Sequence, residues 1–177
     1  MPQLQRDVVA YLRNGNVLVH VEEEEQLRIF DALKQQTIQI LDEPMEWQQA
    51  IHKASEPLLH RAIIKKSYVQ AMIDLLYDYG PYIVLANGVA IAHANPEQGA
   101  NALGLSLLIN KQSITFEDDA NVHFLFVLSN PDQDKHLHLL RDIMRLDNEY
   151  SFSMTSLLKM EDTLAILEGL KKLSNMQ

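Results

Sequence analysis

The sequence contains no cysteine among its 177 residues. This absence excludes a catalytic thiol, a zinc site built on cysteine and any disulfide bond, and it fits a reducing compartment. The chain also lacks an uninterrupted run of about 18 apolar residues, the length that a transmembrane helix needs. Its first residues show neither the basic stretch nor the apolar core of a signal peptide. We therefore expect a soluble, cytoplasmic protein.

Positive charge is scarce as well. Lysine and arginine together number 15 against 24 aspartates and glutamates, which gives a formal net charge of −9. Such a surface repels phosphate backbones, and no Lys/Arg cluster interrupts it, so direct nucleic-acid binding is not expected. It suits a basic protein partner instead, because opposite fields speed encounter.

Hydrophobic periodicity divides the chain into helix-like and strand-like segments. Helices at 46–62 and 67–80 precede a block of strands and then three helices, an order that predicts an α/β layered domain with a mixed sheet. Residues 1–36, with helices predicted at 4–13 and 22–36, are interpreted as an N-terminal extension or linker to a domain at 37–177. The predicted strands are 16–21, 37–41, 82–86, 89–94, 103–109, 113–116 and 122–129, and the last helices are 134–147, 149–160 and 161–173.

Single residues mark where these segments begin, bend or end. Pro57 is expected to interrupt or kink the first core helix. Ser67 is a candidate N-cap of the second helix, and Gly80 is its expected stop. The pair Asn87-Gly88 predicts a tight hairpin turn between two strands.

Seven histidines are the main candidates for chemistry. His20, His52 and His60 stand where surface or half-buried residues are expected. His123 begins the last strand, and a structural role is favoured for it. His136 and His138 resemble a metal-chelating pair, but residues i and i+2 point about 200° apart on a helix, so one ion cannot take both. We expect no metal site there.

His93 differs from the other histidines because it ends a strand-like run, just before a loop. Reactive groups of α/β proteins lie at strand ends and in the loops that follow them. A neutral imidazole nitrogen is a nucleophile, with an unperturbed pKa of about 6.5, and histidine can form covalent intermediates. Spacing alone leaves open a half-buried strand histidine with no chemical role.

The segment "GPYIVLANGVAIAHANPEQG" resembles the active-site segment of enzyme IIA proteins of the mannitol–fructose superfamily of the phosphotransferase system (PTS). The "WQQAI" at Trp47, "YGPY" at 79–82 and "GLSLL" at 104–108 are most similar to the ascorbate-type branch. A second block, "DKHLHLLRDIM", resembles the family's later segment, which opens a helix after a strand. The likeness runs in order from about Thr37 to Leu170.

This resemblance implies a mixed β-sheet flanked by helices on both faces, the enzyme IIA mannitol/fructose-like fold. It implies a phosphoryl relay in which His93 accepts phosphate from the carrier protein HPr and passes it to enzyme IIB. His136 would be the second histidine beside it. No cofactor is implied, the membrane is reached through enzyme IIC, and relatives form monomers or homodimers. An acidic rim around the site would help to attract a basic donor.

The chain departs from the family pattern at three positions. Ala92 stands where proline usually precedes the active histidine, Asn95 replaces a common Arg or Lys, and Tyr77 occupies the place of an arginine in mannitol-type proteins. Two alternatives to a transport role stay open: a sensory enzyme IIA domain of a transcriptional regulator, and a binding module of the same fold without phosphorylation.

Overall fold

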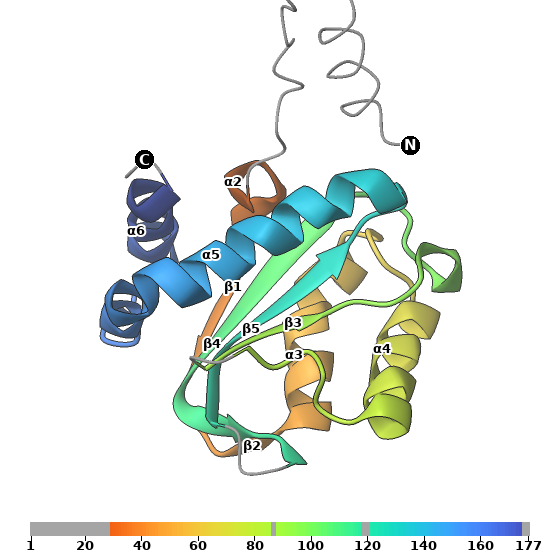
Figure 1. Cartoon of the computed structure of the whole chain (residues 1–177), viewed down its shortest axis with the longest axis horizontal. Helices are drawn as coiled ribbons and strands as arrows, with labels where there is room; N and C mark the ends of the chain where they lie inside the picture. Colours follow the sequence, from red (N-terminus) through yellow and green to blue (C-terminus); the bar gives the residue numbers. More distant parts are fainter. Residues whose placement is uncertain (1–28, 86–87, 118–120, 175–177) are drawn as a thin grey trace, which may run out of the picture.

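The computed structural model describes residues 29–85, 88–117 and 121–174 (Figure 1). Within these ranges the side chains of residues 30, 133–136, 138, 149–153 and 174 are not described. The helix predicted at 4–13, the strand predicted at 16–21, residues 22–28 of the helix predicted at 22–36 and His20 therefore lie outside the described residues. In the described part of the chain, no helix has the length and apolar character needed to cross a membrane.

A five-stranded sheet forms the centre of the molecule, with the order β1-β4-β5-β3 and the short β2 beside β4. β4 and β5 are antiparallel, whereas β1 and β2 pair parallel to β4 and β3 pairs parallel to β5. The predicted mixed sheet is confirmed. The strands are β1 (Leu33–Leu41), β2 (Met45–Glu46), β3 (Val89–Ala92), β4 (Gly104–Thr115) and β5 (Asn121–Ser129).

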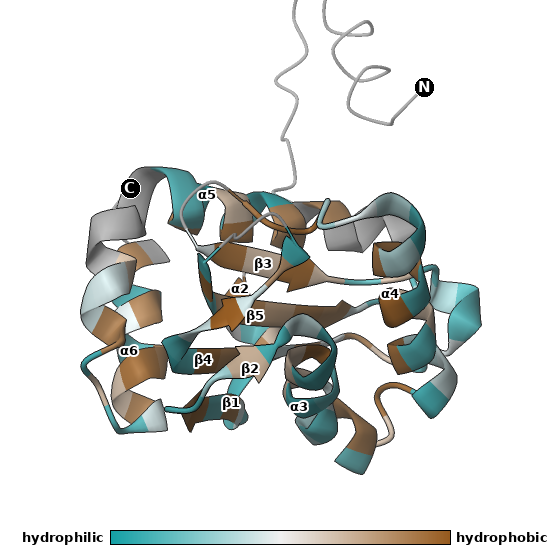
Figure 2. Cartoon of the chain, turned by 90° about the horizontal axis from the view of Figure 1, so that it is seen from below, coloured by the Kyte–Doolittle hydropathy of each residue, from teal (hydrophilic) through white to brown (hydrophobic). Residues whose placement is uncertain are grey.

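Helices cover both faces of the sheet, as the resemblance implied (Figure 1). Alternate residues of the central strands pack into two separate apolar clusters, because successive strand residues point to opposite faces. Figure 2 shows these apolar strands between the helical layers. One face carries α3 (Trp47–His60) and α4 (Lys66–Tyr79), and the other carries α2 (Ile29–Ala32), α5 (Gln133–Leu157) and α6 (Thr163–Ser174).

Several predicted boundaries are wrong for physical reasons. The two helices predicted at 134–147 and 149–160 are the single α5, because no glycine or proline interrupts residues 133–157. β1 begins at Leu33, four residues before the predicted strand, where Leu33 is buried in the core. The predicted strand at 82–86 is reduced to one antiparallel bridge between Val84 and Ala90. The division of the chain at residue 36 stays a prediction.

The predicted caps of α4 have different outcomes. Gly80 ends the helix with a positive φ of 74°, and its N–H bonds to the Leu76 carbonyl, as expected. Ser67 is not the N-cap, because Lys65 occupies that position. The Ser67 hydroxyl instead donates a hydrogen bond of 2.7 Å to the Gln98 carbonyl. This contact ties the start of α4 to a loop that is far away in the sequence.

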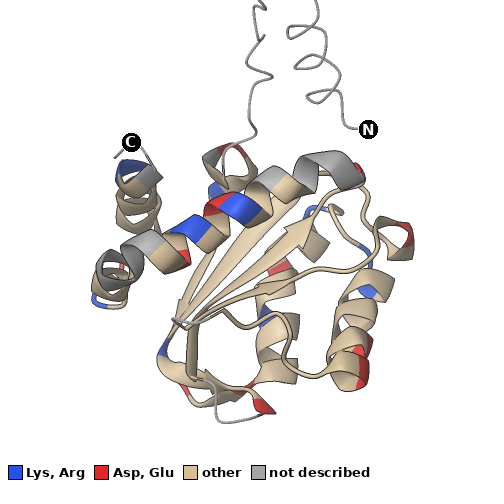
Figure 3. Ribbon diagram, in the orientation of Figure 1, with Lys and Arg blue, Asp and Glu red and all other residues tan. Residues whose placement is uncertain are grey.

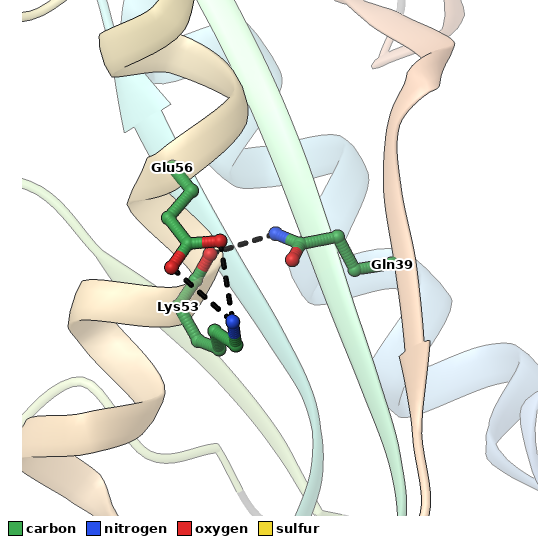
Figure 4. A network of polar contacts seen from close by, with 3 residues as sticks. All are labelled: Gln39, Lys53 and Glu56. Atoms are coloured by element: carbon green, nitrogen blue, oxygen red, sulfur yellow. Dashed lines mark hydrogen bonds and ion pairs between the residues drawn. The ribbon is translucent and has the colours of Figure 1, made fainter.

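Pro57 lies inside α3 without ending it, so the expected interruption is wrong, and the alternative of a kink stays a prediction. In an α-helix the N–H of residue 57 would bond to the carbonyl of Lys53, four residues earlier, and proline has no N–H. The Gln39 side chain from β1 supplies the missing donor, since its Nε2 lies 2.7 Å from the Lys53 carbonyl oxygen (Figure 4). Lys53 also pairs with Glu56 at 3.3 Å. A side chain of the sheet therefore replaces one backbone bond of the helix.

Candidate functional site

The two sequence blocks that carry the resemblance meet at one edge of the sheet. β3 and β5 run parallel with Ala92 opposite Val127, so both strands end at the same edge. His93 follows β3 directly, and α5 begins at Gln133, four residues after the end of β5 (Figure 1). His136 lies in the first turn of α5, and its side chain is outside the described residues. Contact between the two imidazoles stays a prediction.

The His93 ring has one nitrogen engaged with the backbone. Its Nδ1 lies 3.2 Å from the Ile91 carbonyl oxygen, and the side chain is half-buried. A carbonyl can only accept, so this contact requires the proton of the neutral ring to sit on Nδ1. The lone pair is then on Nε2. Strand alternation from Val89 and Ile91 indicates that His93 lies on the α5 face of the sheet.

Tyr68, from the first turn of α4, contacts the backbone just beyond His93. Its hydroxyl accepts a hydrogen bond of 3.0 Å from the Ala94 N–H and donates one of 2.7 Å to the Leu128 carbonyl at the end of β5. Burial raises the pKa of Tyr68 above its ordinary value, so the hydroxyl keeps its proton at neutral pH. Sequence reasoning missed this residue. A tyrosine on the buried face of a helix was a usable signal, because a buried hydroxyl usually has a partner.

The loop after His93 is held in place by the start of α4 and its preceding turn. The Asn95 side chain accepts from the Glu97 N–H at 3.0 Å and begins the short 3-10 helix η1 (Pro96–Gln98). The Gly99 carbonyl accepts from the Lys65 N–H at 2.9 Å, beside the contact of Ser67 with Gln98. The position that lacks the family's Arg or Lys therefore holds a turn-forming asparagine.

The end of β5 is anchored in a similar way. The Ser129 hydroxyl donates to the Ala102 carbonyl at 2.8 Å, which closes the edge on the β4 side. Asn130 is 6% exposed, and its Oδ1 accepts from the Asp132 N–H at 2.9 Å in a turn that leads into α5. Its Nδ2 is buried and has no hydrogen-bond partner. The connection that precedes α5 is thus set by side chain–backbone bonds.

The remaining described histidines are His52, His60 and His123. His52 and His60 are exposed on α3, as expected. His123 lies near the start of β5, at the opposite end of that strand, and its Nδ1 is 2.9 Å from the Asn110 carbonyl oxygen, which supports the structural role favoured for it. The His138 side chain lies outside the described residues. Within those residues, no cluster of three or more His, Asp or Glu side chains could hold a metal ion.

Two departures from the family pattern have clear structural settings. Ala92 is buried and paired in β3, where the N–H that a proline would lack is available to the ladder with β5. Tyr77 is on the last turn of α4, with its ring packed edge-on against Trp47 at 5.2 Å between centroids. It lies at the opposite end of α4 from Tyr68.

Charges beside the site are mixed rather than uniformly acidic. The exposed Lys65 and Lys66 lie where α4 begins, near the loop that carries the exposed Glu97 (Figure 3). The acidic residues of α4, Asp74 and Asp78, lie toward its other end. Described residues of both charge signs therefore lie near this edge, and the acidic rim expected around His93 stays a prediction.

These features define an α/β domain with a half-buried histidine at the edge of a mixed sheet. The sequence matches the family described as "Phosphoenolpyruvate-dependent sugar phosphotransferase system, EIIA 2" over residues 31–173. The chain belongs to this family, whose members are enzyme IIA components of a phosphoryl relay.

The relatives are enzyme IIA proteins of two sugar specificities. The chain is 34% identical over 121 residues to the mannitol-specific cryptic phosphotransferase enzyme IIA component of Escherichia coli, covering 68% of this chain and 82% of that protein. It is 30% identical over 113 residues to the E. coli ascorbate-specific PTS system EIIA component, covering 62% and 73%. The predicted resemblance to enzyme IIA proteins of the mannitol–fructose superfamily, with the ascorbate type among the relatives, is confirmed.

Solved structures agree on the fold. The solution structure of the E. coli mannitol-specific cryptic enzyme IIA matches with a TM-score of 0.70 at 29% identity, covering 82% of this chain and 99% of that chain. The E. coli complex of the mannitol enzyme IIA with phosphorylated enzyme IIB matches with a TM-score of 0.63 at 19% identity, covering 79% and 97%. At that identity the second likeness concerns the fold alone.

Proposed function

We propose that His93 accepts a phosphoryl group from the phosphohistidine of HPr and passes it to an enzyme IIB protein. The contact of Nδ1 with the Ile91 carbonyl supports this role, because it holds the ring proton on Nδ1 and so puts the lone pair that would attack phosphorus on Nε2. Family membership supplies the relay, and the structure of a related fold in complex with phosphorylated enzyme IIB supports the second partner.

The proposed transfer needs little covalent machinery. As the Nε2–phosphorus bond forms, the nitrogen–phosphorus bond of the donor breaks in line, and its electron pair returns to the donor imidazole. The proton of His93 stays on Nδ1, hydrogen-bonded to the Ile91 carbonyl, so the ring gains the phosphoryl group without moving a proton. Backbone N–H groups at the start of α5 would stabilise the charge on the phosphoryl oxygens.

We assign His136 the role of donating an N–H to a phosphoryl oxygen. Its place in the first turn of α5, at the edge where β3 and β5 end, supports this role. The variant His136→Ala is expected to slow phosphorylation of His93 by about 100-fold, as loss of one well-placed charge-stabilising donor does. Rapid-quench transfer from phospho-HPr measures the rate. An unchanged rate would remove His136 from the mechanism.

The sugar is proposed from the relatives. The chain resembles a mannitol-specific and an ascorbate-specific enzyme IIA at 34% and 30% identity, so we propose uptake of a mannitol-like or ascorbate-like sugar through enzyme IIC. Phosphoryl transfer to purified mannitol-type and ascorbate-type enzyme IIB proteins tests this assignment. Transfer to neither protein would contradict it.

The test of the proposed function uses the full chain with phosphoenolpyruvate, enzyme I and HPr. Mass spectrometry should find one phosphoryl group on the wild-type chain and none on His93→Gln. His123→Gln is the matched control, because that histidine lies at the other end of the sheet and should leave phosphorylation unchanged. Phosphate that persists on His93→Gln, or fails to appear on the wild-type chain, would refute the proposal.

A further inference from the structure

The ladder between β3 and β5 stops one hydrogen bond before its regular continuation. In their parallel register Ala92 lies opposite Val127, so Ala94 would lie opposite Ser129. The Ile91 N–H bonds to the Ile83 carbonyl, on the side away from β5. Because successive N–H groups of a strand point to opposite sides, those of Ala92 and Ala94 both point toward β5. The next bond of a parallel ladder would join the Ala94 N–H to the Leu128 carbonyl.

Both of these groups bond to Tyr68 instead. The Ala94 N–H donates to its hydroxyl oxygen at 3.0 Å, and the hydroxyl donates to the Leu128 carbonyl at 2.7 Å. A second acceptor, the Ala94 carbonyl, is more distant at 3.3 Å, and the single hydroxyl proton therefore serves Leu128. One oxygen atom thus stands inside the ladder, between two groups that a regular sheet would bring to about 2.9 Å.

We propose that Tyr68 is a positioning residue, whose hydroxyl holds the end of β3 apart from the end of β5 and so sets where His93 stands relative to the start of α5. The inference rests on the proposed phosphoryl transfer. His93 is the residue between the last ladder pair, Ala92–Val127, and Ala94, which is bound to the hydroxyl. Any change in the separation at Ala94 therefore moves the imidazole.

The position of the tyrosine suits this role. The side chain is 1% exposed and comes from the helical layer on the opposite face of the sheet from α5. It reaches the ladder from the face of the sheet opposite to the one on which His93 lies. The hydroxyl does not contact the reacting atoms, so its effect on transfer is exerted through the backbone of Ala94 and Leu128.

The kinetic test compares Tyr68→Phe with two matched variants. Tyr82→Phe removes a half-exposed tyrosine hydroxyl. Thr37→Val removes a buried hydroxyl of β1, at the far side of the sheet, which donates to the Leu105 carbonyl at 2.8 Å. We expect kcat for transfer from phospho-HPr to fall about tenfold in Tyr68→Phe, which corresponds to a rise of about 1.4 kcal/mol in the activation free energy. KM should stay unchanged, because the variant leaves the docking surface intact. Both controls should keep the wild-type kcat.

A kinetic result for Tyr68→Phe that equals the wild type would overturn the proposal. So would an equal fall in Thr37→Val, because that outcome would mean that any lost buried hydroxyl slows transfer. A fall confined to Tyr68→Phe, with an unchanged KM, supports it.

Nuclear magnetic resonance tests the place of the Tyr68 hydroxyl between Ala94 and Leu128 independently of phosphoryl transfer. In the wild-type chain the Tyr68 hydroxyl proton should exchange slowly with solvent and show a cross-peak to the Ala94 amide, with no scalar coupling between the Ala94 nitrogen and the Leu128 carbonyl carbon. That coupling should appear in Tyr68→Phe if the strands close. Rapid hydroxyl exchange, or the Ala94–Leu128 coupling already present in the wild type, would overturn the inference even if Tyr68→Phe does not fold. If these signals are found but wild-type His93 takes no phosphate, the proposed function fails, whereas the bridging position of the Tyr68 hydroxyl is supported.

Discussion

Helix α3 and the sheet edge beside His93 each contain a side chain in the place of a backbone hydrogen bond. In α3, the Gln39 amide donates to the Lys53 carbonyl that Pro57 cannot reach, and the helix continues (Figure 4). At the sheet edge, the Tyr68 hydroxyl stands between an N–H and a carbonyl that could have bonded directly, and the strands separate. The Gln39 contact completes the hydrogen bonding of a regular helix, whereas the Tyr68 contact interrupts a regular strand ladder.

The difference shows why polar side chains in a core need separate interpretation. Gln39 compensates for a donor that the sequence removed, so its loss should affect stability alone. Tyr68 replaces a bond that the backbone could make without help, so the sheet has no need of it for pairing. A buried hydroxyl at such a place indicates a geometric requirement of the site.

The largest effect is expected at Gly99, in the loop tied to the start of α4. This glycine has a φ of 130°, and an added Cβ would lie 2.7 Å from the Ser67 Oγ and 3.0 Å from the Lys65 Cβ. Gly99→Ala should lower the free energy of unfolding by about 2–4 kcal/mol, because backbone strain and overpacking act together. Urea denaturation measures it.

Gly80→Ala is the matched control for Gly99→Ala. Its φ is also positive, at 74°, but nothing lies within 4 Å of the added Cβ, so it carries the strain alone. Equal losses in the two variants would show that the close approach to Ser67 does not constrain the loop.

Removal of the donor in α3 should have a smaller effect. Gln39→Met keeps the length of the side chain and leaves the Lys53 carbonyl without its partner, at a cost of about 1 kcal/mol in the free energy of unfolding. In a Pro57→Ala background the helix can supply its own N–H, and the same substitution should then cost about half as much or less. A double-mutant cycle measures the coupling. Additive losses would mean that Gln39 does not compensate for Pro57.

The smallest effect concerns alkaline pH. Burial raises the pKa of Tyr68 above its ordinary value of 10.0, so the unfolded chain releases this proton at a lower pH than the folded chain does. The contribution of Tyr68 to stability is complete below pH 10.0 and is lost as the pH rises through the folded-state pKa. Thermal unfolding from neutral to alkaline pH should show a steeper decline in the wild type than in Tyr68→Phe. Parallel curves would contradict this assignment.

The pattern of the sequence predicted the features that depend on local periodicity. It placed a mixed sheet between helices and put His93 at the end of a strand, because burial on a strand and on a helix leaves distinct spacings. It failed for residues 82–86, which are apolar but make a single bridge, and for α5, which it divided in two. An apolar run does not specify whether a neighbouring strand is within reach.

The contacts that position the site could not be predicted from local pattern. Tyr68 bonds to Ala94 and Leu128, which are 26 and 60 residues away, and Gln39 compensates for a proline in another element. Such partners are defined only when the sheet order brings the segments together. The resemblance points to His93 as the residue proposed to react, without indicating what holds its backbone.

The most direct measurement of the central claim is the identity of the phosphorylated nitrogen. The chain is labelled with ¹⁵N-histidine, phosphorylated through enzyme I and HPr, and studied by phosphorus–nitrogen correlation. Because the Ile91 carbonyl holds Nδ1, the phosphoryl group should be found on Nε2 of His93. Phosphate on Nδ1 of that ring, or on a different histidine, would contradict the account.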